Sequence, residues 1–364
     1  MTNLIYSHDR SIRGKWLSPI TAPWKLILFM VCLLALWHIG VQILYGTVTT
    51  PTVEGSVRAK SLALKMAMRA GLFMMFFLCL RLMQFALGSG EGSVFIKLHG
   101  KVKADPARLL RALIMLAIGA ATFVWLQTNF MASKVMIPEI QPFYLDTPLR
   151  NIDKALFFGH DPYRAFQWLF DVPNILKRID QVYTYWAALI AGTWVYCFVS
   201  ERMEPSRRYQ YLLAMILLWL FAGTIGAILL SSAGPVYYGE FTGDYAAYAP
   251  LIDQLYDFHG QYYLDAVNTQ QILLEMYYTP QMRFGGISAA PSLHIASSLM
   301  LLILFWKTAI ARDLLILFNI VIYIGSIILG WHYAVDGLIS IPIVLACWYV
   351  SAFIVKKFIK PAYL

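Results

Sequence analysis

Residues 285–296 read Gly-Gly-Ile-Ser-Ala-Ala-Pro-Ser-Leu-His-Ile-Ala, and residues 330–336 read Gly-Trp-His-Tyr-Ala-Val-Asp. Between His294 and His332 the chain holds two apolar segments that are separated by a polar turn at residues 307–313. Each segment has about the 20 residues that a helix needs to cross roughly 30 Å of hydrocarbon. We therefore expect a membrane hairpin that returns both histidines to the same face of the membrane.

The composition of the chain is that of a membrane protein. Hydrophobic residues make up 59% of the sequence and charged residues 13%, and the mean hydropathy is +0.61. These values are far from those of an ordinary soluble domain. Because apolar segments are spread along nearly the whole chain, we expect one all-α bundle. The first apolar run begins at Trp24 and lacks a small-residue cleavage site, so we interpret it as a retained span.

The hydropathy pattern predicts about eight transmembrane helices. Their expected ranges are 24–45, 66–88, 109–128, 182–200, 210–231, 292–309, 313–331 and 336–355. The second range is the least secure, because Lys65, Arg69 and Arg81 interrupt it.

Basic residues gather beside the ends of the expected helices and predict the orientation of the chain. The formal net charge is +9. Because these residues are not interleaved along an aromatic surface, we expect no nucleic-acid partner. With eight spans all the basic clusters fall on one side, which the positive-inside rule makes cytoplasmic. Both termini are then inside, and His294, His332 and Asp336 are outside. The clusters are Arg10/Arg13/Lys15, Lys97/Lys101/Lys103/Arg108, Arg202/Arg207/Arg208, Lys307/Arg312 and Lys356/Lys357/Lys360.

Two long segments are expected outside the membrane on the side of the histidines. In residues 129–181, Thr147-Pro148 and Asp161-Pro162 are typical helix starts, and Gly159 is a typical stop. The second segment, residues 232–290, is rich in tyrosine, which favours the headgroup layer. We interpret both segments as interfacial lid helices.

The spacing of the polar residues around the two histidines predicts phosphoryl transfer from a lipid. His332 and Asp336 are four residues apart on the next expected helix, which puts them on one helical face. If Asp336 accepts a hydrogen bond from one ring nitrogen of His332, the other nitrogen keeps the lone pair that a nucleophile needs. His294 can then donate a proton to a leaving oxygen. Ser292 lies where a helix begins, and free backbone N–H groups there attract phosphate.

These residues resemble the type 2 phosphatidic acid phosphatase superfamily, whose second signature is P-S-G/L/M-H and whose third is S-R-x5-H-x3-D. Residues 286–294 followed by 332–336 are most similar to its inositol phosphorylceramide synthase (inositolphosphotransferase-like) branch. The pattern within residues 137–162 also resembles bacterial members of that branch. The resemblance implies a six-span core at 109–364, preceded by an N-terminal part at 1–108 with a tail, two transmembrane helices and a cytoplasmic loop.

The resemblance also implies a mechanism and a location. His332 would attack phosphorus to give a phosphohistidine, Asp336 would orient it, and His294 would protonate the departing alcohol. Water or a second alcohol would then complete the cycle, so hydrolysis and headgroup transfer both remain open. No metal and no other cofactor is expected, because the family works without one. The substrate would be a membrane lipid, at the periplasmic face of a bacterial inner membrane.

The sequence departs from the family pattern at the positions of its cations. The first signature, K-x6-R-P, is absent, and residues 232–238 stand in its place. In the third signature, Gly325 and Ser326 stand where Ser and Arg would be. A phosphodiester donor carries less charge than a phosphomonoester and needs fewer cations. The candidate substrate-binding residues are Arg283, Tyr237 and Tyr238, together with Ser292 and Ser326.

Two other classes of function remain as alternatives. Two histidines and an aspartate could hold zinc with an open position. Asp336 is better placed to orient His332 than to share a metal with it, which disfavours this alternative. A transporter would favour broken helices and inverted repeats, which are not apparent in the sequence.

Overall fold

The computed structural model describes residues 23–45, 106–200, 203–279 and 286–359. Every regular element in these ranges is helical. The predicted span at 66–88 and the candidate residue Arg283 lie outside them.

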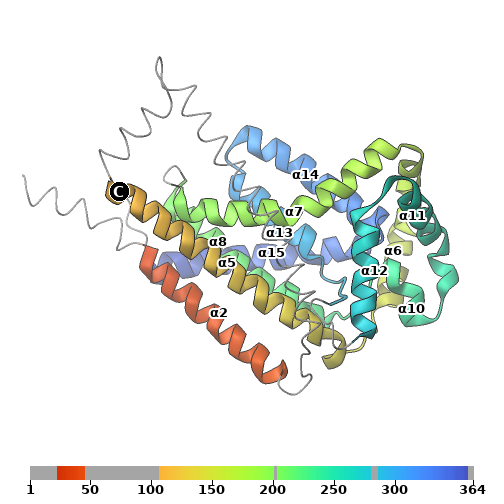
Figure 1. Ribbon diagram of the computed structural model, residues 1–364, viewed down its shortest axis with the longest axis horizontal. Helices are drawn as coiled ribbons and strands as arrows, with labels where there is room; N and C mark the ends of the chain where they lie inside the picture. Colours follow the sequence, from red (N-terminus) through yellow and green to blue (C-terminus); the bar gives the residue numbers. More distant parts are fainter. Residues whose placement is uncertain (1–22, 46–105, 201–202, 280–285, 360–364) are drawn as a thin grey trace, which may run out of the picture.

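Seven helical segments form an elongated bundle (Figure 1). They are α2 (Pro23–Tyr45), α5 (Pro106–Ile140), α7 (Pro173–Val199), α8 (Pro205–Leu220) with its continuation η2 (Phe221–Gly226) and α9 (Ala227–Leu229), α13 (Leu293–Phe305), α14 (Ala309–Ile328), and α15 (Ala334–Ile354) with its continuation η6 (Val355–Ile359). In the described part of the chain, 6 of these segments are long and apolar enough to cross a membrane, and α13 is a shorter apolar helix. Six of the eight predicted spans thus correspond to helices of spanning length. The predicted span at 292–309 corresponds to the shorter helix α13, and the span at 66–88 lies outside the described residues.

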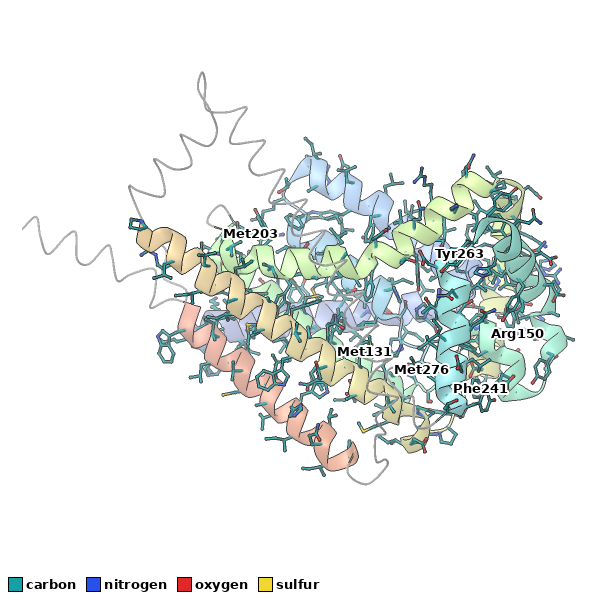
Figure 2. All side chains as sticks on the ribbon, in the orientation of Figure 1. Met131, Arg150, Met203, Phe241, Tyr263 and Met276 are labelled. Atoms are coloured by element: carbon teal, nitrogen blue, oxygen red, sulfur yellow. The ribbon has the colours of Figure 1, made fainter. Side chains whose placement is uncertain are left out.

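Short helices gather at one end of this bundle (Figure 1). Between α5 and α7 they are α6 (Asp146–Leu156) and η1 (Pro162–Asp171). Between α9 and α13 they are η3 (Pro235–Tyr237), α10 (Tyr238–Thr242), η4 (Tyr245–Ala247), α11 (Ala249–Tyr262) and α12 (Asp265–Tyr278). Figure 2 shows Arg150, Phe241 and Tyr263 at this end, and Met203 of the α7–α8 connection near the opposite end. We call the end with the short helices the short-helix end, and the α7–α8 connection lies near the opposite end.

The predicted outer segment at 129–181 is longer than the observed connection between α5 and α7. Helix α5 continues to Ile140, and α7 already begins at Pro173. The reason is that polar residues of α5 bind a neighbouring helix instead of marking a loop. The Asn129 side-chain amide donates to the Leu34 carbonyl at 3.0 Å, and the Trp37 indole donates to the Ser133 hydroxyl at 3.1 Å.

The turn signals in this segment act almost as expected. Helix α6 begins at Asp146, two residues before Pro148, which was the predicted first helical residue after an N-cap at Thr147. Gly159 adopts φ +88 shortly after α6 ends, and Asp161 precedes Pro162 at the first position of η1. Proline is compatible with the first turn of a helix because no N–H is needed there.

Helix α8 lies at the centre of the bundle, with Tyr211 to Trp219 all buried. Small residues allow neighbouring helices of the bundle to come close. A Cβ added to Gly119 would lie 2.9 Å from the ring of Phe198, and one added to Gly223 would lie 2.8 Å from the ring of Phe130. Larger side chains at these two positions would force the helices apart.

Candidate active site

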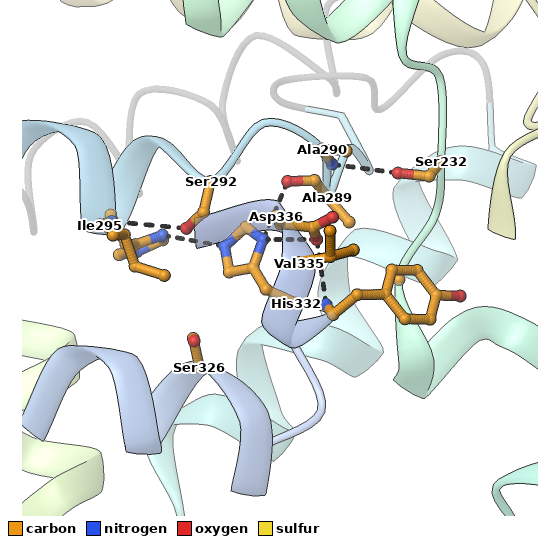
Figure 3. A network of polar contacts seen from close by, with 12 residues as sticks. Ser232, Ala289, Ala290, Ser292, Ile295, Ser326, His332, Val335 and Asp336 are labelled. Carbon is orange, nitrogen blue, oxygen red and sulfur yellow. Dashed lines mark hydrogen bonds and ion pairs between the residues drawn. The ribbon is translucent and has the colours of Figure 1, made fainter. Parts of the chain in front are cut away.

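The segment that follows α9 holds together the two loops that carry the histidines. The Ser232 carbonyl accepts from the Ala289 N–H at 2.9 Å, and its hydroxyl accepts from the Ala290 N–H at 3.0 Å (Figure 3). Four residues later, the Val236 N–H donates to the Gly330 carbonyl at 2.9 Å. Residues 232–236 thus contribute backbone hydrogen bonds to the site.

Gly234 and Asp146 complete this support. Gly234 has φ +98, and a Cβ there would lie 2.6 Å from the Trp331 carbonyl oxygen, so only glycine fits. The Asp146 carboxylate accepts from the N–H groups of Ala233 and Gly234, each at 2.9 Å, and from the Tyr333 hydroxyl at 2.8 Å. Burial raises the pKa of Asp146, and these three hydrogen bonds oppose the rise.

His332 is fixed through its backbone and one ring nitrogen. Its N–H donates to the Ser326 carbonyl at 3.0 Å, and its Nδ1–H donates to the Ala289 carbonyl at 2.9 Å. Nε2 therefore keeps its lone pair and lies 3.5 Å from Nδ1 of His294. Burial, followed by the charge of Lys134, lowers the pKa of His332 to about 3, against the effect of the Ala289 hydrogen bond. The ring is thus neutral at neutral pH.

The predicted placement of His332 and Asp336 on one helix is wrong. Helix α15 begins at Ala334, so His332 precedes it and Asp336 lies in its first turn. From the first turn of α15, Asp336 caps the start of the helix: its Oδ2 accepts from the Tyr333 N–H at 3.0 Å. The same oxygen lies 3.5 Å from His332 Nδ1. The Ala289 carbonyl is thus the closer partner of the ring, and Asp336 Oδ2 is the farther one.

His294 is oriented by aromatic stacking. It is the second residue of α13, whose N-cap is Ser292, and the Ser292 hydroxyl accepts from the Ile295 N–H at 3.4 Å. The His294 ring stacks on Tyr183 with centroids 4.4 Å apart, and packs against Trp186 in a tilted arrangement with centroids 4.2 Å apart. Both aromatic residues belong to α7. His294 is half-buried, whereas His332 is buried.

The start of α15 depends on a second carboxylate that the sequence analysis did not assign to the site. Asp153 of α6 accepts from the N–H groups of Ala334 at 2.7 Å and of Val335 at 2.8 Å. Burial raises the pKa of Asp153 to about 7. Asp153 and Asp336 together satisfy three successive N–H groups directly after His332. The only sequence signal for Asp153 was its place in the pattern at 137–162.

Three of the predicted substrate-binding hydroxyls have partners within the protein. The Tyr237 hydroxyl donates to the Gln270 carbonyl at 3.0 Å, and the Ser326 hydroxyl donates to the Tyr323 carbonyl at 2.7 Å. The Tyr238 hydroxyl shares a 3.1 Å hydrogen bond with the hydroxyl of Thr147. Among these described residues, no hydrogen bond joins the three hydroxyls to a histidine. Their contact with substrate stays a prediction.

The described ranges contain no group of three or more His, Cys, Asp or Glu side chains arranged to hold a metal ion. The histidines and Asp336 form a hydrogen-bonding site, in which the side chains contact one another and the backbone.

Comparison with known proteins assigns the family. No curated protein and no solved structure matches the chain. The family model described as the PAP2 superfamily matches residues 147–350, which is more than half of the 364 residues. The match includes His294, His332 and Asp336, and lies within the predicted core at 109–364. The chain therefore belongs to the PAP2 superfamily, and it is an integral membrane enzyme of the phosphatase type.

Proposed function

We propose that this protein transfers the phosphoryl group of a membrane lipid phosphate or phosphodiester through a phosphohistidine at His332. The observation that carries the proposal is the state of the His332 ring. Nδ1 is held by the Ala289 carbonyl at 2.9 Å, and the unprotonated Nε2 faces Nδ1 of His294 at 3.5 Å. A neutral, oriented imidazole next to a second histidine has the features of an activated nucleophile with an acid–base partner.

In the first step, Nε2 of His332 attacks phosphorus. The N–P bond forms while the bond from phosphorus to the leaving oxygen breaks, and His294, which enters this step as the imidazolium, gives its proton to that oxygen. In the second step, His294 takes a proton from water or from an alcohol, whose oxygen then attacks phosphorus. The N–P bond breaks and its electron pair returns to Nε2, so both histidines regain their starting states.

Asp336 acts by charge in this mechanism. Formation of the N–P bond places positive charge on the His332 ring, and the carboxylate 3.5 Å from Nδ1 stabilises that charge. Oδ1 of Asp336 is buried and has no hydrogen-bond partner among the described residues. This oxygen can therefore interact with the positive charge that forms on the His332 ring. Replacement of Asp336 by Asn should therefore slow the reaction while leaving the ring near its place.

The substrate reaches the histidines from the short-helix end. His294 is half-buried, so this ring offers the access that the buried His332 lacks. The direct 3.5 Å contact between the two rings must open when a phosphoryl group enters. We assign α6, η1 and α10 to α12 the role of a lid over this entrance, on the extracytoplasmic face.

Headgroup transfer of the inositol phosphorylceramide synthase type is the favoured form of the reaction. The segment at 232–236 forms backbone hydrogen bonds with the loops that carry the two histidines, and it contains no lysine or arginine. A site with few cations suits the single negative charge of a phosphodiester. Simple hydrolysis of a lipid phosphate is the alternative.

The test is to incubate the purified protein with a panel of lipid phosphates and phosphodiesters, with and without alcohol acceptors, and to identify products by mass spectrometry. We expect turnover by the wild type, dependence on an alcohol acceptor, and loss of turnover in His332→Ala and His294→Ala. His160→Ala is the matched control, because His160 is exposed on the loop after α6. Full activity of His332→Ala would refute the mechanism, and products without acceptor would favour hydrolysis.

A further inference from the structure

A transferring phosphoryl group spreads negative charge over its oxygens, and enzymes meet that charge with fixed positive groups. The cations of the family's first and third signatures are missing here. We propose that Lys134 of α5 supplies the missing charge and binds the phosphate of the substrate beside the two histidines. This inference rests on the proposed function, and it deepens it by naming the residue that recognises the phosphate.

The backbone at Lys134 lies directly against the loop that holds His332. A Cβ added to Gly286 would lie 2.0 Å from the Lys134 carbonyl oxygen and 3.2 Å from the Val135 nitrogen. Gly286 is three residues before Ala289, whose carbonyl accepts from His332 Nδ1. Only glycine at this position lets α5 come so close. The contact therefore brings the last two turns of α5 to the histidine site.

In the described part of the chain, the Lys134 side chain has no acidic partner. It is half-buried, and its Nζ lies 5.6 Å from the centre of the Phe130 ring. Within the described ranges, no ion pair joins it to an Asp or Glu. Removing an ammonium group from water without a counterion is costly. An anionic substrate would supply that counterion.

The charge of Lys134 lowers the pKa of the His332 ring. After burial, it is the next largest cause of the lowered pKa of His332. The same electrostatic field that disfavours a proton on His332 favours a phosphate beside it. A cation in this place therefore both keeps the nucleophile neutral and attracts its target.

The competing interpretation is a lysine near a helix end that reaches the headgroup layer. Lys177 serves as the matched control for it, because Lys177 is exposed near the start of α7, at the short-helix end of the bundle. If Lys134 only anchored the protein in the headgroup layer, substitution of Lys134 and of Lys177 would have the same effect on activity. A phosphate-binding residue would matter only at position 134.

The experiment measures kcat/KM on a lipid that the wild type turns over, and inhibition by orthovanadate, for Lys134→Met, Lys134→Arg and Lys177→Met. We expect Lys134→Met to lower kcat/KM by about 100-fold to 1,000-fold and to weaken vanadate inhibition by a similar factor. Lys134→Arg keeps the charge and should recover part of the loss, and Lys177→Met should match the wild type. If Lys134→Met does not fold, Lys134→Gln is measured with the same expectation.

The outcomes separate this inference from the proposed function. Wild-type kcat/KM and vanadate inhibition in Lys134→Met would overturn the role of Lys134 and leave the proposed function intact. A wild type that turns over no lipid would contradict the proposed function. In that case inorganic phosphate still tests Lys134: it should raise the melting temperature of the wild type in detergent but not of Lys134→Met. Equal shifts in the two proteins would overturn the inference.

Discussion

Replacement of Asp153 by Asn perturbs the start of α15, directly after His332. The carboxylate accepts from the N–H groups of Ala334 and Val335 at 2.7 and 2.8 Å. Asparagine offers one oxygen and one NH2 group, so one of the two N–H groups would face a donor. A buried donor without an acceptor costs about 1–3 kcal/mol. If that cost appears in the transition state as a displaced His332, kcat/KM falls by about 5-fold to 150-fold.

The same site predicts a pH dependence of activity. Burial raises the pKa of Asp153 to about 7, against its two backbone hydrogen bonds. The protonated carboxyl group turns one acceptor into a donor, so it resembles asparagine. We therefore expect kcat/KM of the wild type to rise as pH increases through about 7, and to approach that of Asp153→Asn at acidic pH. His332, with a pKa of about 3, stays neutral throughout this range.

The free energy of unfolding should change in the opposite direction. Because the pKa of Asp153 is raised on folding, the folded protein binds more protons than the unfolded chain between the ordinary pKa of 3.8 and about 7. Its contribution to stability is complete below the ordinary pKa and is lost as pH rises through 7. The slope is about 1.4 kcal/mol per pH unit in that window. Asp153→Asn should lack this slope.

The assay compares wild type, Asp153→Asn and Asp253→Asn in detergent at pH 5, 6, 7 and 8, by kcat/KM and by thermal unfolding. Asp253 is an exposed carboxylate on α11, so its variant is expected to follow the wild type. Stability curves of wild type and Asp153→Asn that run parallel between pH 5 and 7 would refute the raised pKa. A wild-type kcat/KM that is constant over the whole range would refute the link to His332.

Gly286→Ala would place a Cβ 2.0 Å from the Lys134 carbonyl and should lower stability by about 1–3 kcal/mol, whereas Gly260→Ala, with no atom within 4 Å, should be tolerated. Equal melting temperatures of these two variants would refute the close contact of α5 with the histidine loop. For orientation, the four natural cysteines are replaced by alanine, and Gln261→Cys or Lys307→Cys is added. An impermeant thiol reagent on intact cells should label only the Gln261→Cys protein, and labelling of Lys307→Cys alone would reverse the proposed sidedness.

The pairing of the histidines followed from sequence because it depends on simple lengths. Two apolar legs, the 13 residues of α13 and the 20 residues of α14, return the chain to the same end of the bundle, and the 3.5 Å contact of His294 with His332 agrees with that geometry. The starts of α6 and η1 were also close to their predicted places, because proline and glycine act locally.

The supporting contacts could not be predicted in this way. The ring of His332 is oriented by the carbonyl of Ala289, and a backbone carbonyl leaves no trace in residue type. Asp153 and Lys134 come from segments far away in sequence, so their positions depend on how the helices pack. Asn129 looked like part of an outer loop because polarity alone does not tell a loop from a hydrogen bond between helices.

Phosphorylation of His332 can be measured directly. The purified protein is mixed with a lipid donor that carries radiolabelled phosphorus, the reaction is stopped at alkaline pH within a single turnover, and the labelled peptide is identified by mass spectrometry. We expect an acid-labile label on His332 that chases into product when the acceptor is added, and that accumulates more slowly in His294→Ala. Turnover without any label on His332, or with the label on His294, would contradict the phosphohistidine mechanism.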